Sequence, residues 1–362
     1  MNDKEKKLLY DLTDALDIIF CHELQDELYD KEETKNYPYG IWFRGHECYN
    51  YKLLPKIYRF DIEDNKPKSE YYDESNIFSH FRLRHPEYHF SHRDTIDWLC
   101  LMQHYGLPTR LLDWTESILI ALFFAVKDNH HTNDKDGTLI VLNANRLNRM
   151  LDLEISSANI LNPQDIPILL RAEIASNYRL TDAIDKVEEY AKIANEQLSK
   201  LLGNLKKGKI DDLSDSFVRY PLAIFPNRLN ARMIVQSGVF TIHGGKICEN
   251  FQVNPKNCFF KRGANENDCL KEKCVTHPIS LEKLNDEQDN KHKIIAHYKI
   301  PSERKETIRK QLRAIGIHDG TIFPELEYQA NFVKEEWHYK KDIDDDVWTK
   351  YSSFRPKDCP IR

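Results

Sequence analysis

The residue types best suited to chemistry cluster in one short segment, residues 103–115, which reads Gln-His-Tyr-Gly-Leu-Pro-Thr-Arg-Leu-Leu-Asp-Trp-Thr. An imidazole, a phenol, a hydroxyl, a guanidinium and a carboxylate lie close together there: His104, Tyr105, Thr109, Arg110 and Asp113. A guanidinium can bind phosphate or carboxylate through two parallel hydrogen bonds, and a carboxylate can take up a proton. Two interpretations stay open. The segment is a binding or catalytic site, or Arg110 and Asp113 form a buried pair that only joins two core helices.

The residues on either side of this segment predict helices. Apolar residues at helical spacing precede it, namely Ile96, Leu99 and Cys100. An unbroken apolar run, 118–126, follows it. Gly106 suits the left-handed residue that ends a helix, and Pro108 stops the helix from resuming. Asp113 or Thr115 could cap the second helix by accepting from its free amides. We therefore predict a helix, a short polar elbow and a buried helix.

Two further segments carry arginines where a ligand could bind. Arg44 ends a predicted buried strand just before Gly45, so it is either aimed at a ligand or held by an acid. Arg228, Arg232 and Gln236 are spaced four apart, and a helical turn would stack them on one face. They could hold an anionic ligand or form a row of structural salt bridges. Residues 49–60, after the first of these segments, are both aromatic and basic.

Cysteines and histidines do not form a convincing metal motif. One polar segment holds Cys248, Cys258, Cys269, Cys274 and His277. Zinc sites usually need two closely spaced ligand pairs, and only Cys274 with His277 is close. A second group, His85, His89 and His92, surrounds a proline and shares no regular face. We predict no metal site, although zinc binding by the cysteine segment stays open.

Composition limits the class of protein. Of the 362 residues, 41% are hydrophobic, which is enough for a packed core. The formal charge of −6 argues against a protein that coats nucleic acid with a broadly basic surface, while a local basic groove remains compatible. The N-terminus lacks the pattern of a signal peptide, and the longest apolar run is too short to span a bilayer. We expect a cytoplasmic protein without a membrane contact, with reduced thiols and an undetermined oligomeric state.

The order of predicted elements indicates an α+β fold with a mixed central β-sheet, surrounding helices and an inserted helical layer. The predicted strands are 41–44, 138–142, 220–225, 239–242 and 294–300. Unequal, mostly helical connections between them do not give the regular alternation of a doubly wound sheet. We expect an N-terminal amphipathic helix within 1–35, a main domain over 36–340 and a C-terminal tail over 341–362. The main domain would carry a helical insertion at about 150–215 and a cysteine-containing insertion at about 245–292.

Four blocks, taken together and in order, resemble the FRG domain, a bacterial and phage family named for a Phe-Arg-Gly block. They are residues 42–45, 103–115 with 121–125 behind them, 232–241 and 322–326. The resemblance spans about residues 40–335. The resemblance implies that the gene occurs in phages or mobile DNA, and such an occurrence points to a toxin or a phage-defence effector. The family name alone does not settle the activity.

The first block is also similar to the first motif of arginine-type ADP-ribosyltransferases, in which that arginine grips the phosphates of NAD. This second resemblance implies an ADP-ribosyltransferase-like fold, with Arg44 as the phosphate clamp and Tyr105 as the face that stacks on nicotinamide. The remaining candidates for binding NAD are polar residues of the elbow and the third block: His104, Thr109, Arg110 and Arg232. Gln236 stands where those enzymes carry glutamate, so the catalytic candidates are Gln236, Glu325 and Asp113. Glu327 is a further acid of the same segment.

Two functions of different classes therefore compete. One is an enzyme that uses NAD to modify a protein or a nucleic acid. The other is a non-catalytic module that senses a nucleotide, a nucleic acid or a phage component. No Walker loop, dinucleotide-binding glycine fingerprint or Gly-x-Ser-x-Gly elbow is present in the sequence, which removes the usual nucleotide folds and hydrolases from consideration.

Overall fold

A computed structural model describes part of the chain. The described residues are 8–20, 28, 40–60, 62–63, 66–67, 72, 74–91, 95–129, 131–149, 221–244, 246–247, 275–276, 278–286 and 293–337. The predicted helical insertion and the five zinc candidates, Cys248, Cys258, Cys269, Cys274 and His277, lie outside these residues. The predicted C-terminal tail lies outside them too.

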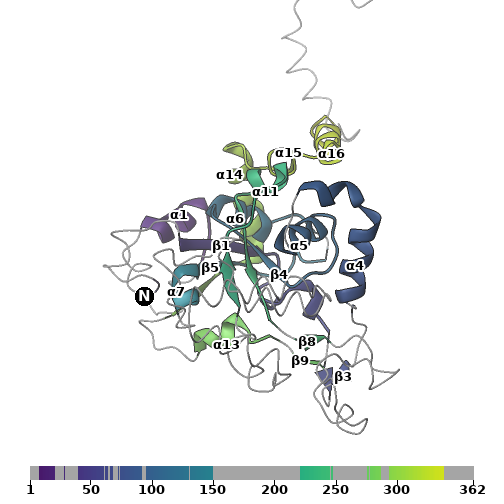
Figure 1. Ribbon diagram of the computed structural model, residues 1–362. Helices are drawn as coiled ribbons and strands as arrows, with labels where there is room; N and C mark the ends of the chain where they lie inside the picture. Colours follow the sequence, from purple (N-terminus) through teal and green to yellow (C-terminus); the bar gives the residue numbers. More distant parts are fainter. Residues whose placement is uncertain are drawn as a thin grey trace, which may run out of the picture.

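A six-stranded antiparallel sheet forms the centre of the molecule (Figure 1). In spatial order it consists of β10 (Ile295–Ile300), β5 (Gly137–Asn143), β1 (Ile41–His46), β4 (Leu111–Thr115), β7 (Gly238–Ile242) and β6 (Leu222–Ile224). Every strand pair in this sheet is antiparallel, and a single bridge from Leu8 to Lys299 is parallel. The α+β class is confirmed, with a sheet whose strand pairs are antiparallel rather than mixed. All five predicted strands are present.

The sixth strand, β4, corrects the prediction of an elbow between two helices. The first helix, α5 (Thr95–His104), ends as expected, because Gly106 has φ of +80°. The chain then enters β4, which pairs with β7 over its whole length, from Leu111 opposite Ile242 to Thr115 opposite Gly238. Leu111, Leu112 and Trp114 are buried by this pairing. The apolar residues of the segment therefore belong to the sheet, and the second helix, α6 (Ile118–Ala125), begins only after it.

Three apolar clusters pack on the sheet, and alternation along the strands assigns them to its two faces. Phe43, Leu139 and Val141 belong to a cluster with α6, α1 (Leu12–Phe20) and α14 (Lys305–Ala314). Their strand neighbours Trp42, Ile140 and Leu142 belong to a cluster on the opposite face, where α7 (Ala144–Arg149) and α13 (Leu281–Asp286) pack. Figure 1 shows α6 and α14 on one side of the sheet and α13 on the other.

The third cluster covers the other half of the first face. It joins Leu111, Phe240 and Ile242 of the sheet to α5 and to α4 (Glu74–Arg84). Two separate helical layers thus lie on one face of the sheet, one over β10, β5 and β1 and one over β4, β7 and β6. The boundary between them follows the line where β1 and β4 meet.

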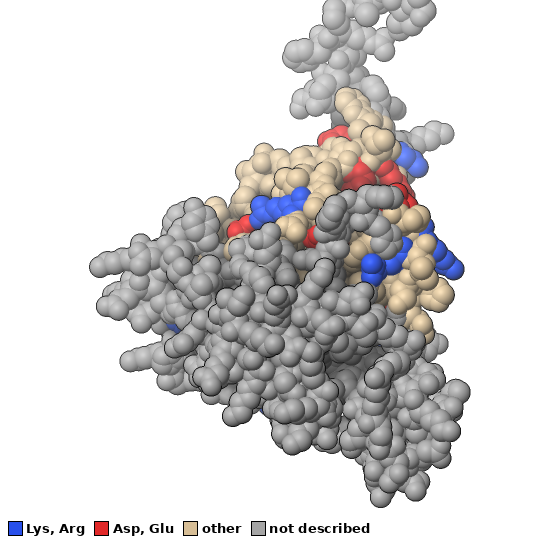
Figure 2. All heavy atoms as spheres, in the orientation of Figure 1, with Lys and Arg blue, Asp and Glu red and all other residues tan. Residues whose placement is uncertain are grey.

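The remaining elements are short and complete the body. They are η2 (Lys56–Tyr58), β2 (Ile62–Glu63), β3 (Lys66–Pro67), η3 (Pro86–Ser91), α11 (Ala231–Val235), β8 (Lys246–Ile247), β9 (Val275–Thr276), η6 (Ser302–Arg304), α15 (Asp319–Ile322) and α16 (Leu326–Glu336). Within the described part of the chain no helix is long and apolar enough to span a membrane. Figure 2 shows one side of the molecule, in the orientation of Figure 1. Acidic and basic side chains both occur on the described surface there, so neither charge dominates it.

Candidate functional site

A gap in the sheet between β1 and β4 forms the candidate site. These two neighbouring strands pair at a single position, Phe43 opposite Thr115, whereas β1 pairs with β5 along its entire length. A cleft of about 1280 Å³ opens there. Its lining comes from both faces of the sheet and from α5, α6 and α11. A break in the strand pairing therefore provides space that a continuous sheet would close.

Gly45 lets α6 lie directly on β1 at one side of this cleft. A Cβ atom on Gly45 would lie 1.9 Å from the carbonyl oxygen of Ala121 and 2.5 Å from the amide nitrogen of Ala125. Both contacts are to backbone, so no side-chain movement could relieve them. Gly45 is thus required for the close packing of α6 on β1, the strand that carries Arg44.

Arg44 reaches from β1 across the gap to β4. Its Nη1 donates to the backbone oxygen of Asp113 at 2.5 Å and lies 3.9 Å from Asp113 Oδ2. The guanidinium thus takes the place of a missing strand-to-strand hydrogen bond. Burial lowers the pKa of Arg44 to about 10, although Asp113 opposes the shift, so the side chain stays charged at neutral pH. Within the described part of the chain, its Nη2 has no hydrogen-bond partner and remains available to a ligand.

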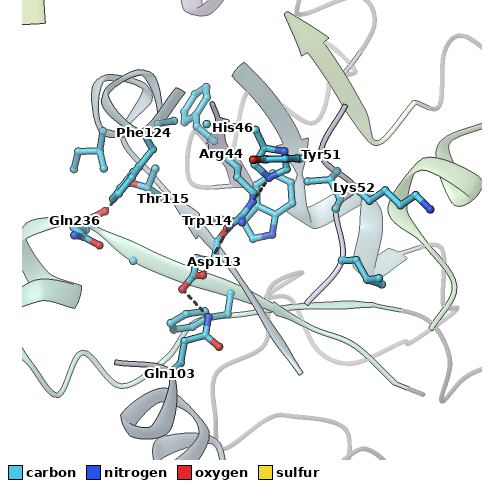
Figure 3. Close-up of a pocket in the computed structure, with 18 of the residues that line it drawn as sticks. Arg44, His46, Tyr51, Lys52, Gln103, Asp113, Trp114, Thr115, Phe124 and Gln236 are labelled. Atoms are coloured by element: carbon cyan, nitrogen blue, oxygen red, sulfur yellow. Dashed lines mark hydrogen bonds and ion pairs between the residues drawn. The ribbon is translucent and has the colours of Figure 1, made fainter. Parts of the chain in front are cut away.

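His46 orients Arg44 from the same strand. Arg44 Nε donates to His46 Nε2 at 2.8 Å, which requires that this ring nitrogen be unprotonated. Burial, reinforced by the charge of Arg44, lowers the pKa of His46 to about 3. The imidazole is therefore neutral at physiological pH and acts as an acceptor that fixes the plane of the guanidinium. Figure 3 shows the two side chains side by side in the cleft.

Asp113 supplies the exposed carboxylate of the site. Its side chain is 60% exposed, although its strand neighbours Leu112 and Trp114 are buried. Oδ1 accepts from Gln103 Nε2 at 2.8 Å (Figure 3), and Gln103 Oε1 in turn accepts from the hydroxyl of Thr109. Thr109 was predicted to bind NAD, but it is fully buried and does not line the cleft. Its contact with Gln103 instead orients the amide that holds Asp113.

Arg110 is not part of the cleft. It is fully buried and forms a two-bond pair with Glu74 of α4, with Nε to Oε1 at 2.8 Å and Nη2 to Oε2 at 2.5 Å. Its Nη1 also lies 3.4 Å from the carbonyl oxygen of His243. The interpretation of Arg110 and Asp113 as partners of one buried pair is therefore wrong. Arg110 is paired, but with Glu74 of α4, since it lies just before β4 whereas Asp113 lies within that strand.

The predicted residues of the third and fourth blocks lie at one end of the cleft. Arg232 of α11 and Gln236 line it, and so does His104. Arg232 Nε donates to Glu325 Oε1 at 2.7 Å, and its guanidinium lies 5.2 Å from the ring centre of Phe323. These contacts link α11 to the segment between α15 and α16.

Most of the polar groups at this end are already engaged. Gln236 donates from Nε2 to the carbonyl oxygen of Ile322 at 3.2 Å. Burial raises the pKa of Glu325, but its bond to Arg232 and the charges of Arg232 and His104 lower it more, so the net shift is downward. The pKa of His104 is lowered, first by burial and then by Arg232. Glu325 is thus held as an ionised partner of Arg232. Arg228 likewise pairs with Glu116, but it does not line the cleft, so of these two arginines only Arg232 faces the site.

Tyr105 lies outside the cleft, contrary to its predicted role as a stacking face. Its side chain is largely exposed, its ring lies near Phe81, and a hydrogen bond with Tyr88 raises its pKa. Among the aromatic residues that line the cleft, Tyr51 and Phe124 are candidates for that role, because neither is buried (Figure 3). Glu327 does not line it either.

Sequence reasoning missed several residues of the cleft wall. Tyr51, Lys52 and Arg59 line it, and they come from the aromatic and basic stretch after β1. The composition of that stretch was the available signal. His46 and Gln103 carried no comparable signal, because a histidine in a strand and a glutamine in a helix are ordinary. Among the described residues no group of three potential metal ligands occurs.

The arrangement combines a cationic wall, one exposed carboxylate and an apolar end. Arg44, Lys52 and Arg59 form the wall, Asp113 supplies the carboxylate, and Phe124 contributes to the apolar end. Ligand pockets are typically about 300–1,000 Å³ and mostly apolar with a few placed polar groups, so this cleft is large for a single small molecule. Its chemistry suits an extended ligand with a phosphate part and an aromatic part.

Comparison with known proteins gives one match. Residues 40–134 match the family model of the FRG domain. No curated protein and no solved structure matches the chain. The matched stretch is shorter than the four-block resemblance, since blocks 232–241 and 322–326 lie beyond it, but it includes β1, the elbow, β4 and α6. Arg44, Gln103 and Asp113 are within it, and Arg232, Gln236 and Glu325 are not. The chain therefore carries an FRG domain over residues 40–134.

Proposed function

We propose that the cleft binds NAD and that the protein transfers ADP-ribose from it to a protein or a nucleic acid. The observation that carries the proposal is the pairing of Arg44 with Asp113 across the gap between β1 and β4. A charged guanidinium with a free Nη2 and an exposed carboxylate face the same cleft from adjacent strands. The reaction requires this pair of groups, one for phosphate and one for the reacting sugar.

Each part of the cleft has a role in this reaction. Arg44, supported by Lys52 and Arg59, would bind the diphosphate, and Tyr51 or Phe124 would contact the nicotinamide ring. Asp113 would lie beside the ribose. The bond between ribose C1′ and the nicotinamide nitrogen breaks, and its electron pair leaves with neutral nicotinamide. A bond forms from C1′ to the acceptor, whose proton passes to the carboxylate of Asp113.

Asp113 is the best of the three catalytic candidates because it alone offers a carboxylate that is mostly exposed. Glu325 is bound to Arg232, and Gln236 carries no carboxylate and donates to the carbonyl oxygen of Ile322. Gln103 and Arg44 hold Asp113 without covering it, since its side chain stays 60% exposed. A toxin or phage-defence effector is the cellular role that we propose with this activity.

The test is release of nicotinamide from labelled NAD by the full chain in a cell lysate, together with transfer of the label to a macromolecule. We expect both products from the wild type and neither from Asp113→Asn. Asp134→Asn is the matched control, because Asp134 is also an exposed aspartate and does not line the cleft. Equal nicotinamide release by the Asp113 and Asp134 variants would refute the role of Asp113.

A second candidate function rests on the hydrogen bonds that Gln236 and Glu325 already form within the protein. If Asp113 has no role in bond breaking, neither Gln236 nor Glu325 replaces it, and the module would only bind its ligand. It would then sense a nucleotide, a nucleic acid or a phage component. In that case NAD or another nucleotide would bind, Arg44 variants would lose binding, and no nicotinamide would be released.

A further inference from the structure

A strip of aromatic and basic side chains lies along one rim of the cleft. It belongs to the segment that runs from β1 through η2. The side chains in 47–60 that are exposed are Tyr49, Asn50, Tyr51, Lys52, Lys56 and Arg59. Two tyrosines, an amide and three cations are therefore the exposed side chains of this segment, and its one acid, Glu47, is only partly exposed.

The apolar residues of the segment fix the strip in place. Leu53, Ile57 and Tyr58 alternate with the exposed residues and are buried, and the hydroxyl of Tyr58 donates to the carbonyl oxygen of His243 at 3.2 Å. Arg59 Nε donates to the carbonyl oxygen of Leu54 at 3.0 Å. The polar side chains are thus carried on a backbone that is anchored to the core rather than on a free loop.

The single acidic residue of the segment offsets only part of this charge, because the segment carries three cations. Glu47 is half-buried, and its Oε2 accepts from Asn129 Nδ2 at 2.7 Å and from the hydroxyl of Thr132 at 2.9 Å. At the other end of the segment, Lys56 Nζ donates to the carbonyl oxygen of Gly106 at 2.9 Å, and it forms no ion pair among the described residues. The strip therefore keeps a net positive charge on a protein whose formal charge is −6.

The strip is continuous with the candidate site. Tyr51, Lys52 and Arg59 line the cleft, and the ring centre of Tyr51 lies 6.0 Å from that of His46, the residue that orients Arg44. The side chain of Tyr51 is 52% exposed, so an incoming planar group can reach its ring. A polymer bound along the strip would therefore run into the cleft beside Arg44 and Asp113.

We propose that the strip Tyr49, Tyr51, Lys52, Lys56 and Arg59 binds a single-stranded nucleic acid, and that this strand is the acceptor of the ADP-ribosyl group. Exposed aromatic rings stack on bases whose faces are open, and interleaved cations follow the phosphate backbone. A duplex would hide the base faces from the tyrosines. The role of the strand as acceptor rests on the proposed function, whereas its binding does not.

Binding is tested without NAD, by fluorescence anisotropy of a labelled single strand of about 16 nucleotides, the upper end of site sizes for such grooves. The full chain should bind the strand more tightly than a duplex of equal length. Tyr51→Ala should weaken binding by at least about fivefold, since a lost base stack has that effect or more. The logarithm of affinity should fall with the logarithm of salt with a slope of about −2 for three phosphate contacts, and Lys52→Ala should reduce that slope by about 0.7.

Tyr10→Ala and Lys310→Ala are the matched controls, because both residues are exposed, lie just before α1 and in α14, and do not line the cleft. Neither should change binding. Absence of binding by the wild type, equal loss in the controls, or equal binding of a duplex would overturn the inference. A protein that becomes labelled while single strands do not would show that the acceptor is a protein.

The outcomes separate this inference from the proposed function. Asp113→Asn should bind the single strand normally while it loses transfer. Binding of the single strand without any nicotinamide release would support the proposed binding surface and refute the proposed transferase activity. Nicotinamide release without binding of single strands would support the proposed transferase activity and refute the proposed binding surface.

Discussion

Two arginines, Arg44 in β1 and Arg110 directly before the neighbouring strand β4, have opposite environments. Arg110 is fully buried and forms two hydrogen bonds with Glu74, while Arg44 faces the cleft and contacts Asp113 mainly through a backbone oxygen. Glu74 is also buried, whereas the side chain of Asp113 is 60% exposed. Each arginine also has a buried histidine beside it, His243 near Arg110 and His46 near Arg44.

This difference separates a structural pair from a functional one. In the Arg110–Glu74 pair, both carboxylate oxygens accept hydrogen bonds from the guanidinium. The pair therefore fixes α4 against the sheet. Arg44 keeps one nitrogen free, and its acid remains open to solvent. An ion pair that is incompletely satisfied and lies in a cleft indicates a ligand, whereas a fully satisfied buried one indicates architecture.

The largest expected effect concerns the buried pair. Glu74→Gln should lower the free energy of unfolding by about 3–5 kcal/mol, because it leaves the guanidinium of Arg110 buried without its charge partner. Chemical denaturation of the purified protein measures this. Replacing both residues, with Arg110→Met and Glu74→Leu together, should recover much of the loss. If Glu74→Gln unfolds at the wild-type denaturant concentration, the pair is not structural.

The pH dependence of stability tests the two histidines. Burial, with a further contribution from the neighbouring arginine, lowers the pKa of both His46 and His243 from 6.5 to about 3. The unfolded chain therefore takes up these protons first, and stability falls as the pH drops from 6.5 towards 3. Each histidine should contribute a slope of about 1.4 kcal/mol per pH unit in this range.

Single substitutions distinguish these slopes from those of the carboxylates. His46→Gln and His243→Gln should each reduce the dependence of unfolding free energy on pH by about one proton relative to wild type. Only His46→Gln should also weaken a ligand of the cleft, because His46 orients Arg44 and His243 does not line the cleft. A variant with the same pH slope as wild type would show that its histidine is protonated in the folded protein.

The smallest effect on stability is expected at Asp113. Asp113→Asn should change the free energy of unfolding by no more than about 1 kcal/mol, because a pair with an exposed acid contributes little. The amide can still accept from Gln103, so the local geometry should persist. Thermal melting of this variant beside Glu74→Gln compares the two acids directly. A loss at Asp113 as large as that at Glu74 would remove the distinction between them.

The sequence predicted the elements that follow from local patterning. The helices α5 and α6, the left-handed Gly106 and all five predicted strands are present, because apolar periodicity and glycine conformation act over a few residues. The strand β4 was missed for the same reason. Its five residues follow a glycine and a proline, which indicate a turn, and only pairing with the distant β7 makes them a strand.

The site was predicted in part. Arg44, Asp113, Gln236, Arg232 and His104 do line one cleft, although they come from separate blocks of the sequence. Long-range partners could not be predicted, because nothing in the sequence near Arg110 indicates an acid 36 residues earlier, at the start of α4. The gap between β1 and β4 was equally hidden, since it arises where a strand pairing stops.

The most direct test of the account is a titration of the protein with NAD, on wild type and Arg44→Lys, with thermal melting of the same samples. Lysine keeps the charge but lacks the fork that contacts His46, Asp113 and a phosphate at once. We predict that wild type binds NAD, that Arg44→Lys binds it more weakly by about 1.5–3 kcal/mol, and that the melting temperature stays nearly constant. A wild type that does not bind NAD, with a melting temperature that falls in Arg44→Lys, would contradict the account, because Arg44 would then be structural in the way that Arg110 is.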